Sequence, residues 1–586
     1  MGQRSAFLSW EFIIYYIIIA STLTYHFVDN YHVNWDKPRQ IHRVWPDDRT
    51  WTFKKSPADM SDHQWNMWRN NFPVLFTFFS IWTLASVLLK KLFPNSPNDQ
   101  LNPDPSRHSL GKMHIVRTIF YPLSGLIFIY VLHGRCMIYW GMAVMTLYLV
   151  AKLFGHIPVL GALAPWAVLV PWFLGVYRLD AMRLLGFLGL QSTFVGTFVQ
   201  WVNQARGQMG WSSPFNVTTL RLVSFALDYH WSFRGPRAER EAQARVHAIA
   251  EPMTLKARER MSLPRVAYGL LNYITYASYA PLYIGGPIIT YNAFVSQLLA
   301  PPSSASAAKD RAGSSFKAIL RAAFTDVHSW AYKVTYLLRV LLWTVFTDVY
   351  THVFWATALL VGSDEYQHAG ALEMSRTFFL ACCFTYLKFY TIFRFFRAWS
   401  NLDGIMTWEN QPRCFVRGSG FAVFWRTWHV SLNRWNIRYL YVPAKGYKYP
   451  LVSVWMVFFF IAFWHEPTLE WVRWAAGNAA GLVIETVIVK LATSDKRPGH
   501  EGGLIARLKQ HHLLWTILGT CCNVVASFAL PMVQVQTNRD WSWTVDTLRK
   551  YFTGPGALAA LAFNIPWHYA TMRISNAIDA AQGDGE

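Results

Sequence analysis

The sequence has little charge for its length. Asp, Glu, Lys and Arg make up 15% of its 586 residues, whereas soluble domains carry about 25%. Hydrophobic residues account for 53% and aromatic residues for 17%. This balance argues against a string of soluble domains, although the length would allow about four. It predicts one helical body in a membrane, with aromatic side chains at the lipid–water boundaries.

Acidic residues are especially scarce, with 33 Asp and Glu against 54 Lys and Arg and a formal net charge of +21. A basic balance suits nucleic-acid binding when the charge is gathered on a soluble surface or tail. Here the basic residues lie mainly between apolar segments, as the positive-inside rule and the attraction of anionic lipids predict. We therefore expect membrane lipids, and no nucleic acid, as partners.

Cysteine is also rare. The six residues lie at positions 136, 382, 383, 414, 521 and 522. None shows CxxC spacing, and five lie within or at the ends of apolar stretches. The pattern indicates neither a disulfide framework nor a zinc site, so we expect core thiols and no bound metal.

The common catalytic signatures are missing as well. No GxSxG elbow, GxxxxGK[ST] loop or GxGxxG turn occurs, which argues against the enzymes that depend on them. His465 and Glu466 begin like the zinc motif HExxH, but Leu469 occupies the position of the second histidine. Pro467 would also distort the helix that must present both ligands.

Long apolar runs, by contrast, follow one another along the chain. Most are long enough to cross a bilayer, and the first resembles an uncleaved signal anchor. The total is about 11–13 spans of ~20 residues, which predicts an all-α, polytopic membrane protein. The candidate apolar segments, not all of which are long enough to count as a full span, are residues 7–25, 72–89, about four within 115–202, 267–290, 330–349, 353–361 with its neighbours, 377–396, 451–474, 475–491, 513–532 and 556–570. The pattern of residues 221–231 predicts a short amphipathic helix that lies against the transmembrane helices.

Polar segments separate these spans within a single domain of residues 1–586. Residues 28–71 have nearly balanced charge, which predicts a luminal loop. Residues 90–117 read as a cytoplasmic linker, and residues 233–265 as a basic cytoplasmic segment near anionic headgroups. Residues 300–316 have the composition of a flexible linker.

An ionisable pair ends one very apolar run. Residues 451–464 carry no ionisable side chain before His465 and Glu466. The histidine lies roughly 21 Å along that helix, inside a ~30 Å hydrocarbon layer. Such a residue is costly unless it faces a protein interior or a cavity. A histidine hydrogen-bonded in the core and a functional histidine both remain open.

A second polar cluster lies in residues 424–443, FWRTWHVSLNRWNIRYLYVP. Arg426, His429 and Asn433 are spaced to share one face of a helix. An interfacial helix with aromatic anchors and snorkelling arginines is the alternative. Just upstream, residues 401–410 place Asp403, Glu409 and Asn410 beside apolar spans.

Together these blocks resemble the membrane-bound O-acyltransferase (MBOAT) family. The resemblance rests on RFFRAW at 394–399, the D-G-I and E-N pairs within 401–410, residues 424–443, and FWHE at 463–466. The segments RLVSFALDYHW (221–231) and 268–294 place it nearest the fungal glycerol-uptake-protein branch, with the hedgehog acyltransferases. The sequence departs from the pattern at residues 443–446, which read PAKG, and at Glu466, where Asp is expected.

The resemblance implies a catalytic block at residues 394–474, in a fold whose helices surround a central reaction chamber. His465 would be the catalytic base and His429 the second active-site residue. The residues expected to bind substrate are Trp425, Arg426, Asn433, Asp403, Glu409, Asn410, Arg394 and Arg438. Acyl-coenzyme A (acyl-CoA) would be a co-substrate, with no tightly bound cofactor.

The branch further implies a multi-pass protein of the endoplasmic reticulum. The acceptor would be a hydroxyl of a lysolipid, in particular the lyso-phosphatidylinositol of glycosylphosphatidylinositol (GPI) anchors. A polyol transporter, a protein N-acyltransferase and a non-catalytic regulator of lipidation are the alternatives. Transporters often show two matching halves, which this sequence lacks. Whether Asn216, in the sequon Asn-Val-Thr, carries a glycan stays open.

Overall fold

The computed structural model describes residues 57–93, 119–177, 192–233 (except 206 and 211), 254–299, 329–362, 370–414 and 421–493. It also describes short pieces between residues 13 and 46 and isolated positions elsewhere. Several expected segments lie outside the described residues: the 300–316 linker, most of the 233–265 segment, most of the linker after residue 93, and nearly all of the 7–25, 513–532 and 556–570 spans.

The described chain is built of helices, which confirms the all-α membrane fold. Its only described strands, β1 (Val44–Pro46) and β2 (Pro57–Asp59), pair antiparallel over three residues each. By length and composition, three described helices can cross a membrane: α3 (His63–Leu92), α6 (Met137–Phe154) and the segment Arg376–Asp403. Three shorter apolar helices lie at Tyr121–His133, Leu160–Val170 and Pro450–His465.

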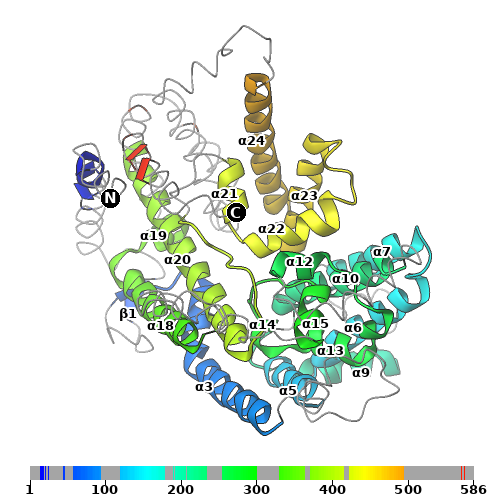
Figure 1. Cartoon of the computed structure of the whole chain (residues 1–586). Helices are drawn as coiled ribbons and strands as arrows, with labels where there is room; N and C mark the ends of the chain where they lie inside the picture. The colour runs from blue at the N-terminus through cyan, green and yellow to red at the C-terminus, as the bar shows by residue number, and fades with distance from the viewer. Residues whose placement is uncertain are drawn as a thin grey trace, which may run out of the picture.

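Helix α20 (Ala371–Asp403) packs against both α3 and α18 (Trp330–Val353), and these three helices occupy one side of the molecule (Figure 1). Aromatic rings fill the α3–α20 interface. Trp68 packs edge-on against Phe395 and Phe396, and Phe79 against Trp399. Ion pairs close both ends: Asp62 with Lys388 at 2.7 Å, and Lys90 with Asp403 at 2.6 Å.

A second group of helices forms the opposite side of the molecule (Figure 1). It contains α5 (Tyr121–His133), α6, α7 (Leu160–Tyr177), α9 (Phe194–Gln204), α10 (Ser212–Trp231), α12 (Leu255–Arg260), η4 (Arg265–Tyr268), α13 (Leu270–Ser278), α14 (Ala280–Tyr283) and α15 (Tyr291–Leu299). The expectation of a short peripheral helix at 221–231 is wrong. Helix α10 begins at Ser212, and its residues from Thr218 to His230 are buried between α6, α7 and α13.

The expected single span at 267–290 is also wrong. The chain forms three short helical pieces there, η4, α13 and α14, and then an extended stretch to Thr290. Pro281 opens α14, because a proline fits the first turn of a helix but not its interior. The buried Arg221 satisfies the carbonyl groups left open at this break, donating to Tyr276 O and Ala277 O at 3.3 and 3.2 Å.

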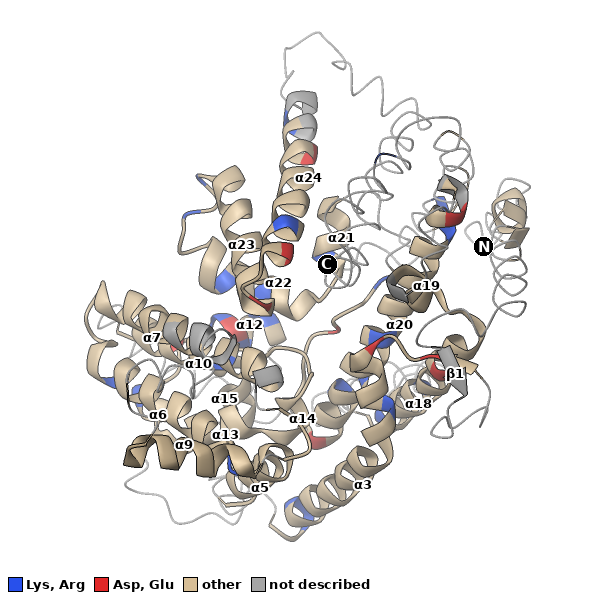
Figure 2. Cartoon of the chain, turned by 180° about the vertical axis from the view of Figure 1, so that it is seen from behind, with Lys and Arg blue, Asp and Glu red and all other residues tan. Residues whose placement is uncertain are grey.

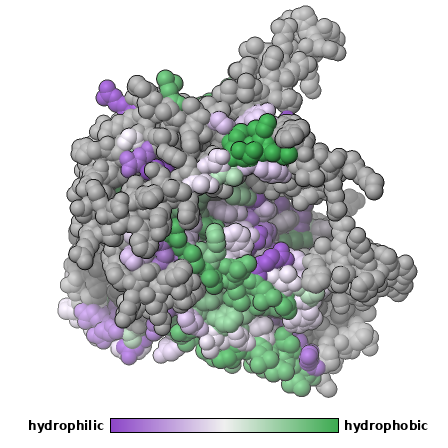
Figure 3. All heavy atoms as spheres, turned by 90° about the vertical axis from the view of Figure 1, so that its left-hand side faces the viewer, coloured by the Kyte–Doolittle hydropathy of each residue, from purple (hydrophilic) through white to green (hydrophobic). Residues whose placement is uncertain are grey.

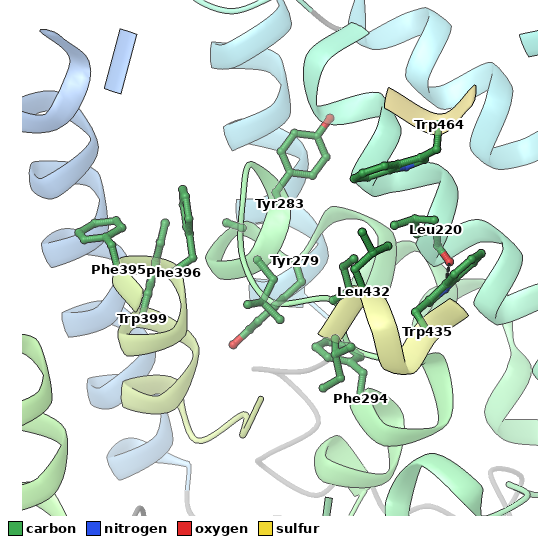
Figure 4. Close-up of a cluster of buried hydrophobic side chains, with 14 of the residues drawn as sticks. Leu220, Tyr279, Tyr283, Phe294, Phe395, Phe396, Trp399, Leu432, Trp435 and Trp464 are labelled. Atoms are coloured by element: carbon green, nitrogen blue, oxygen red, sulfur yellow. Dashed lines mark hydrogen bonds between the residues drawn. The ribbon is translucent and has the colours of Figure 1, made fainter. Parts of the chain in front are cut away.

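The last described group is α21 (Phe421–Thr427), α22 (Val430–Asn436), the π-helical turn η7 (Ile437–Tyr441), α23 (Pro450–His465) and α24 (Leu469–Thr493). Helices α23 and α24 form a hairpin whose turn lies at residues 466–468, not near 474 as the spans predicted. Pro467 explains the early end, because it cannot continue the helix. Trp435 of α22 donates its indole N–H to Leu220 O of α10 at 3.0 Å (Figure 4), which ties this group to the second one.

The outer surface of the described helices suits contact with lipid. Lys, Arg, Asp and Glu positions are few and separated along the described helices (Figure 2). Apolar side chains form broad patches on the face seen in Figure 3. Large apolar residues of α3 and α18, such as Ile81 and Leu338, are 65% and 60% exposed. A water-soluble protein would bury such residues at a gain of about 1.5–3 kcal/mol each.

Candidate active site

A cavity of about 1160 Å³ lies between the helix groups. Residues of α3, α5, α10, α20, α21, α22, η7, α23 and α24 line it, most of them aromatic or aliphatic. This volume is somewhat larger than the roughly 300–1,000 Å³ of typical small-molecule sites. Both histidines singled out in the sequence, His429 and His465, are on its wall.

His465 is the last residue of α23, and its imidazole is held by aromatic rings. It stacks on Trp471 with ring centroids 4.2 Å apart and planes 8° from parallel, and Trp464 lies edge-on at 4.7 Å. Asn216 of α10 donates its side-chain N–H to the His465 carbonyl at 3.3 Å. Trp464 donates in turn to Asn216 O at 2.8 Å. The ring is therefore fixed on the cavity wall by two neighbouring elements.

His429 lies at the break between α21 and α22, in the left-handed conformation with φ of 50°. A non-glycine residue rarely adopts this conformation without a functional or structural constraint. Its ring stacks on Phe393 of α20 with centroids 4.6 Å apart. Both His429 and His465 line the same cavity.

The break corrects the expectation that Arg426, His429 and Asn433 share one continuous helix. Arg426 belongs to α21 and Asn433 to α22. All three still line the cavity, and so does Trp425. Arg426 is exposed, while Asn433 is half-buried one turn after His429.

Asn410 lies behind the site rather than on its wall. Its backbone carbonyl accepts from Val430 N at 3.0 Å, and its side-chain oxygen accepts from Ser431 N at 3.1 Å. Ser431 then accepts from Ile288 N at 2.8 Å. Asn410, which is fully buried, thus satisfies the open amide groups at the start of α22 and fixes the backbone that presents His429.

Asp403, Glu409, Arg394 and Arg438 do not line the cavity. Each belongs to a buried polar network instead. Asp403 accepts from Tyr279 and Lys90. Glu409 accepts from Arg394 at 3.2 Å and from Tyr336 at 2.8 Å, and Arg438 donates to Asp228 at 2.7 Å. A charge inside an apolar body must be paired, so these residues join helices.

Four further wall residues were not expected at the site from the sequence. Trp471 and Asn216 hold His465, and Asn436 lies one turn beyond Asn433 with its Oδ1 unbonded among the described residues. Lys388 is a buried cation on α20. An ionisable residue inside an expected span indicates a functional site. Lys388 is such a residue, because it lies within the expected span 377–396, so the sequence did contain a signal for it. Asn216 was noted only for its glycosylation sequon, and no local feature of the sequence placed Asn216 or Asn436 at the site.

The part of the chain that the structure describes contains no group of three or more His, Cys, Asp and Glu residues that could hold a metal ion. The polar groups on the cavity wall include two imidazoles and several amides, together with the cations of Lys388 and Arg426. An imidazole can remove a proton near neutral pH, and amides can orient a substrate or stabilise charge. The site therefore suits acid–base chemistry on an apolar, elongated substrate.

Fold and site together define a polytopic helical membrane protein with a histidine-bearing internal chamber. The profile described as MBOAT, membrane-bound O-acyltransferase family, matches residues 167–529. The match covers more than half of the chain, and the chain belongs to this family.

Curated relatives agree with that assignment. The chain is 28% identical over 482 residues to the membrane-bound O-acyltransferase gup1 of Schizosaccharomyces pombe, covering 80% of this chain and 73% of the relative. It is 28% identical to the membrane-bound O-acyltransferase GUP1 of Saccharomyces cerevisiae, covering 72% and 67%. It is 26% identical to the protein-cysteine N-palmitoyltransferase HHAT of Mus musculus, covering 42% and 46%. The chain is thus similar to fungal O-acyltransferases and to a protein acyltransferase.

Proposed function

We propose that this protein moves a long-chain acyl group from acyl-CoA to a hydroxyl of a lipid acceptor, with His465 as the general base. One observation carries the proposal: His465 and His429 lie on the wall of one large, mostly apolar cavity. Such a cavity can hold an acyl chain and an acceptor lipid beside an imidazole.

The reaction requires a proton transfer and a good position for two substrates. A thioester is already activated, but an alcohol is a weak nucleophile. His465 takes the hydroxyl proton while the oxygen attacks the thioester carbonyl. The tetrahedral oxyanion collapses, the carbon–sulfur bond breaks, and the coenzyme A thiolate leaves and takes up the proton. No covalent enzyme intermediate is needed.

The other polar wall residues have supporting roles in this proposal. His429 and Asn433 orient the acceptor or stabilise the oxyanion, because both reach the cavity from the same short helix region. Arg426 lines the cavity and is exposed, so it can attract the phosphates of coenzyme A. Arg394 and Arg438 are left out of this role because carboxylates hold them.

The acceptor we propose is the lyso-phosphatidylinositol of GPI anchors, in the endoplasmic reticulum membrane. Support comes from the fungal O-acyltransferases among the relatives and from the fungal branch that the sequence resembles. The similarity to HHAT supports a second candidate, acyl transfer to a protein.

One assay tests the proposal and its alternative. Purified protein is incubated with labelled acyl-CoA and a panel of lysolipids, diacylglycerol and peptides, and mass spectrometry identifies the acylated product. An acylated lysolipid is expected. An acylated peptide would favour the second candidate. Glycerol uptake into proteoliposomes without any acylated product would indicate a transporter.

The general-base role predicts a large loss in one variant. His465→Ala should lower the rate of transfer by roughly 10²–10⁴-fold, the usual contribution of a general base. The matched control is His156→Ala, which removes an exposed histidine that does not line the cavity. Both proteins should elute as monodisperse species from size exclusion. Transfer at the wild-type rate by His465→Ala would refute the assignment.

A further inference from the structure

Lys388 places a positive charge on a cavity wall that is otherwise mainly apolar. It lies in the middle of α20 and is 3% exposed. Its Nζ donates to Asp62 Oδ2 at 2.7 Å and lies 4.8 Å from the Phe389 ring centroid. The mechanism above assigns no task to this ammonium group.

The Lys388 ammonium group has N–H donors beyond the one that binds Asp62. A lysine carries three N–H donors, and among the described residues only one of them is used, by Asp62. The second oxygen of Asp62 accepts from Trp65 N at 2.7 Å. The pair is therefore neutral while the cavity is empty, which limits the cost of burial. An anion in the cavity could still bind the remaining donors.

A purely structural link between α3 and α20 would not need a lysine at this place. Aromatic packing already joins the two helices, and apolar residues commonly replace buried ion pairs without loss of stability. A cation that faces a binding cavity is instead expected where a ligand carries negative charge.

The position of Lys388 along α20 places it on the same cavity wall as the residue that supports His429. The cavity-lining residues of α20 form one stripe at helical spacing: Thr385, Lys388, Phe389, Ile392 and Phe393. Phe393 stacks on His429. Lys388 is five residues earlier, about 7.5 Å along the helix axis. Lys388 and the residue that supports His429 therefore lie on the same α20 face of one cavity.

We propose that Lys388, neutralised at rest by Asp62, is the subsite for the phosphate of the acceptor headgroup. Phosphate bound there places the free glycerol hydroxyl of a lysophospholipid at His429 and His465. The exposed His63 and Gln64 at the start of α3 line the same end of the cavity and face the rest of the headgroup. This inference rests on the proposed acyl transfer and selects an anionic lysolipid over diacylglycerol or a peptide amine.

The kinetic test compares three variants with the wild type. Lys388→Met should raise the KM for lyso-phosphatidylinositol by roughly ten- to a hundredfold, as loss of a charge-assisted contact does. Lys388→Arg should keep most of the affinity. The double variant Asp62→Asn/Lys388→Met leaves no unpaired buried charge, yet should show the same high KM. The KM for acyl-CoA should not change in any of them. A wild-type KM for the lysolipid in the double variant would show a structural role and overturn the proposal.

A binding measurement separates this inference from the proposed reaction. Protein carrying His465→Ala, in phosphatidylcholine nanodiscs, is titrated with dodecyl phosphate, dodecanol and inorganic phosphate. Dodecyl phosphate should bind, and the added double substitution should weaken it at least tenfold while dodecanol is unaffected. Equal binding with and without Lys388, or equal binding of inorganic phosphate, would overturn the headgroup subsite. Absence of acyl transfer by the wild type would instead refute the proposed function, with the binding result still decisive for Lys388.

Discussion

At the scale of single residues, the site depends on how its neighbours hold two imidazoles. His465 is the last residue of α23, where the helix carbonyls lack partners within the helix. Asn216 bonds to one of them, that of His465 itself. Because the side chain of Asn216 faces His465 within a helix, the sequon serves the site geometry, and we predict that it carries no glycan.

Asn216→Ala tests both statements about this residue. The variant should turn over several-fold more slowly, with an unchanged KM for acyl-CoA, because the base is less well placed while the binding surface is retained. Wild-type protein should not change in mass after treatment with peptide N-glycosidase. A mass decrease on treatment, or wild-type turnover by the variant, would contradict the placement.

His429 depends on Asn410 in a similar way. Asn410→Ala removes the acceptor for Ser431 N and leaves a buried amide group unbonded, at a cost of about 1–3 kcal/mol. We expect a lower melting temperature and reduced transfer. Gln411→Ala provides a neighbouring control, because Gln411 is also buried and both of its side-chain polar atoms are unbonded among the described residues. Equal effects of the two substitutions would refute a specific role for Asn410.

At the scale of elements, charged side chains join helices whose apolar faces do not by themselves fix register. Lys90 near the end of α3 binds Asp403 at the end of α20, and Ser86, Tyr121 and Tyr279 bond to the same carboxylate. One buried carboxylate thus connects α3, α5 and α20 with the break after α13.

Two neighbouring lysines of α3 allow a matched test. Lys90→Ala leaves the fully buried Asp403 carboxylate without its cation and should cost about 3–5 kcal/mol of stability. Lys91→Ala removes an exposed charge and should change stability by less than about 0.5 kcal/mol. Thermal unfolding in detergent, followed by size exclusion, gives the comparison. Equal melting temperatures would contradict the role of the Lys90–Asp403 pair.

At the scale of the whole molecule, the direction of α3 sets the orientation of the protein in the membrane. This helix has 30 residues, a length of about 45 Å, so its ends lie on opposite sides of the bilayer. The charge balance before α3 and the basic residues after it predict that His63 is luminal and Lys91 cytoplasmic.

Single cysteines at these positions, in a chain with its own six cysteines replaced, test that orientation. In sealed microsomes an impermeant maleimide should label Lys91→Cys, and it should label His63→Cys only after the membrane is permeabilised. The reverse labelling pattern would show that α3 has the opposite orientation, and that acyl-CoA arrives from the other side of the membrane.

The sequence alone predicted much of the fold and part of the candidate site. Apolar runs identified helices such as α3, α6 and α20, because burial in lipid and helix formation both act locally along the chain. The apolar runs failed at 267–290, where the chain breaks into short helices around the buried Arg221. They also failed at 221–231, which is part of the longer helix α10 buried between other helices. The resemblance named His429 and His465. The further candidates Asp403, Glu409, Arg394 and Arg438 were chosen from motif and charge, and the structure places them in ion pairs away from the cavity wall.

The sequence by itself therefore determined the class of protein: composition and hydropathy require a membrane body, and motif residues mark the family. Tertiary structure alone decided which polar residues face the cavity. A buried charge can be satisfied by another residue or by a ligand, and the partner comes from a segment far away in the chain. Lys388 and Asp62 are 326 residues apart, and only folding brings that pair to the wall that carries the two histidines.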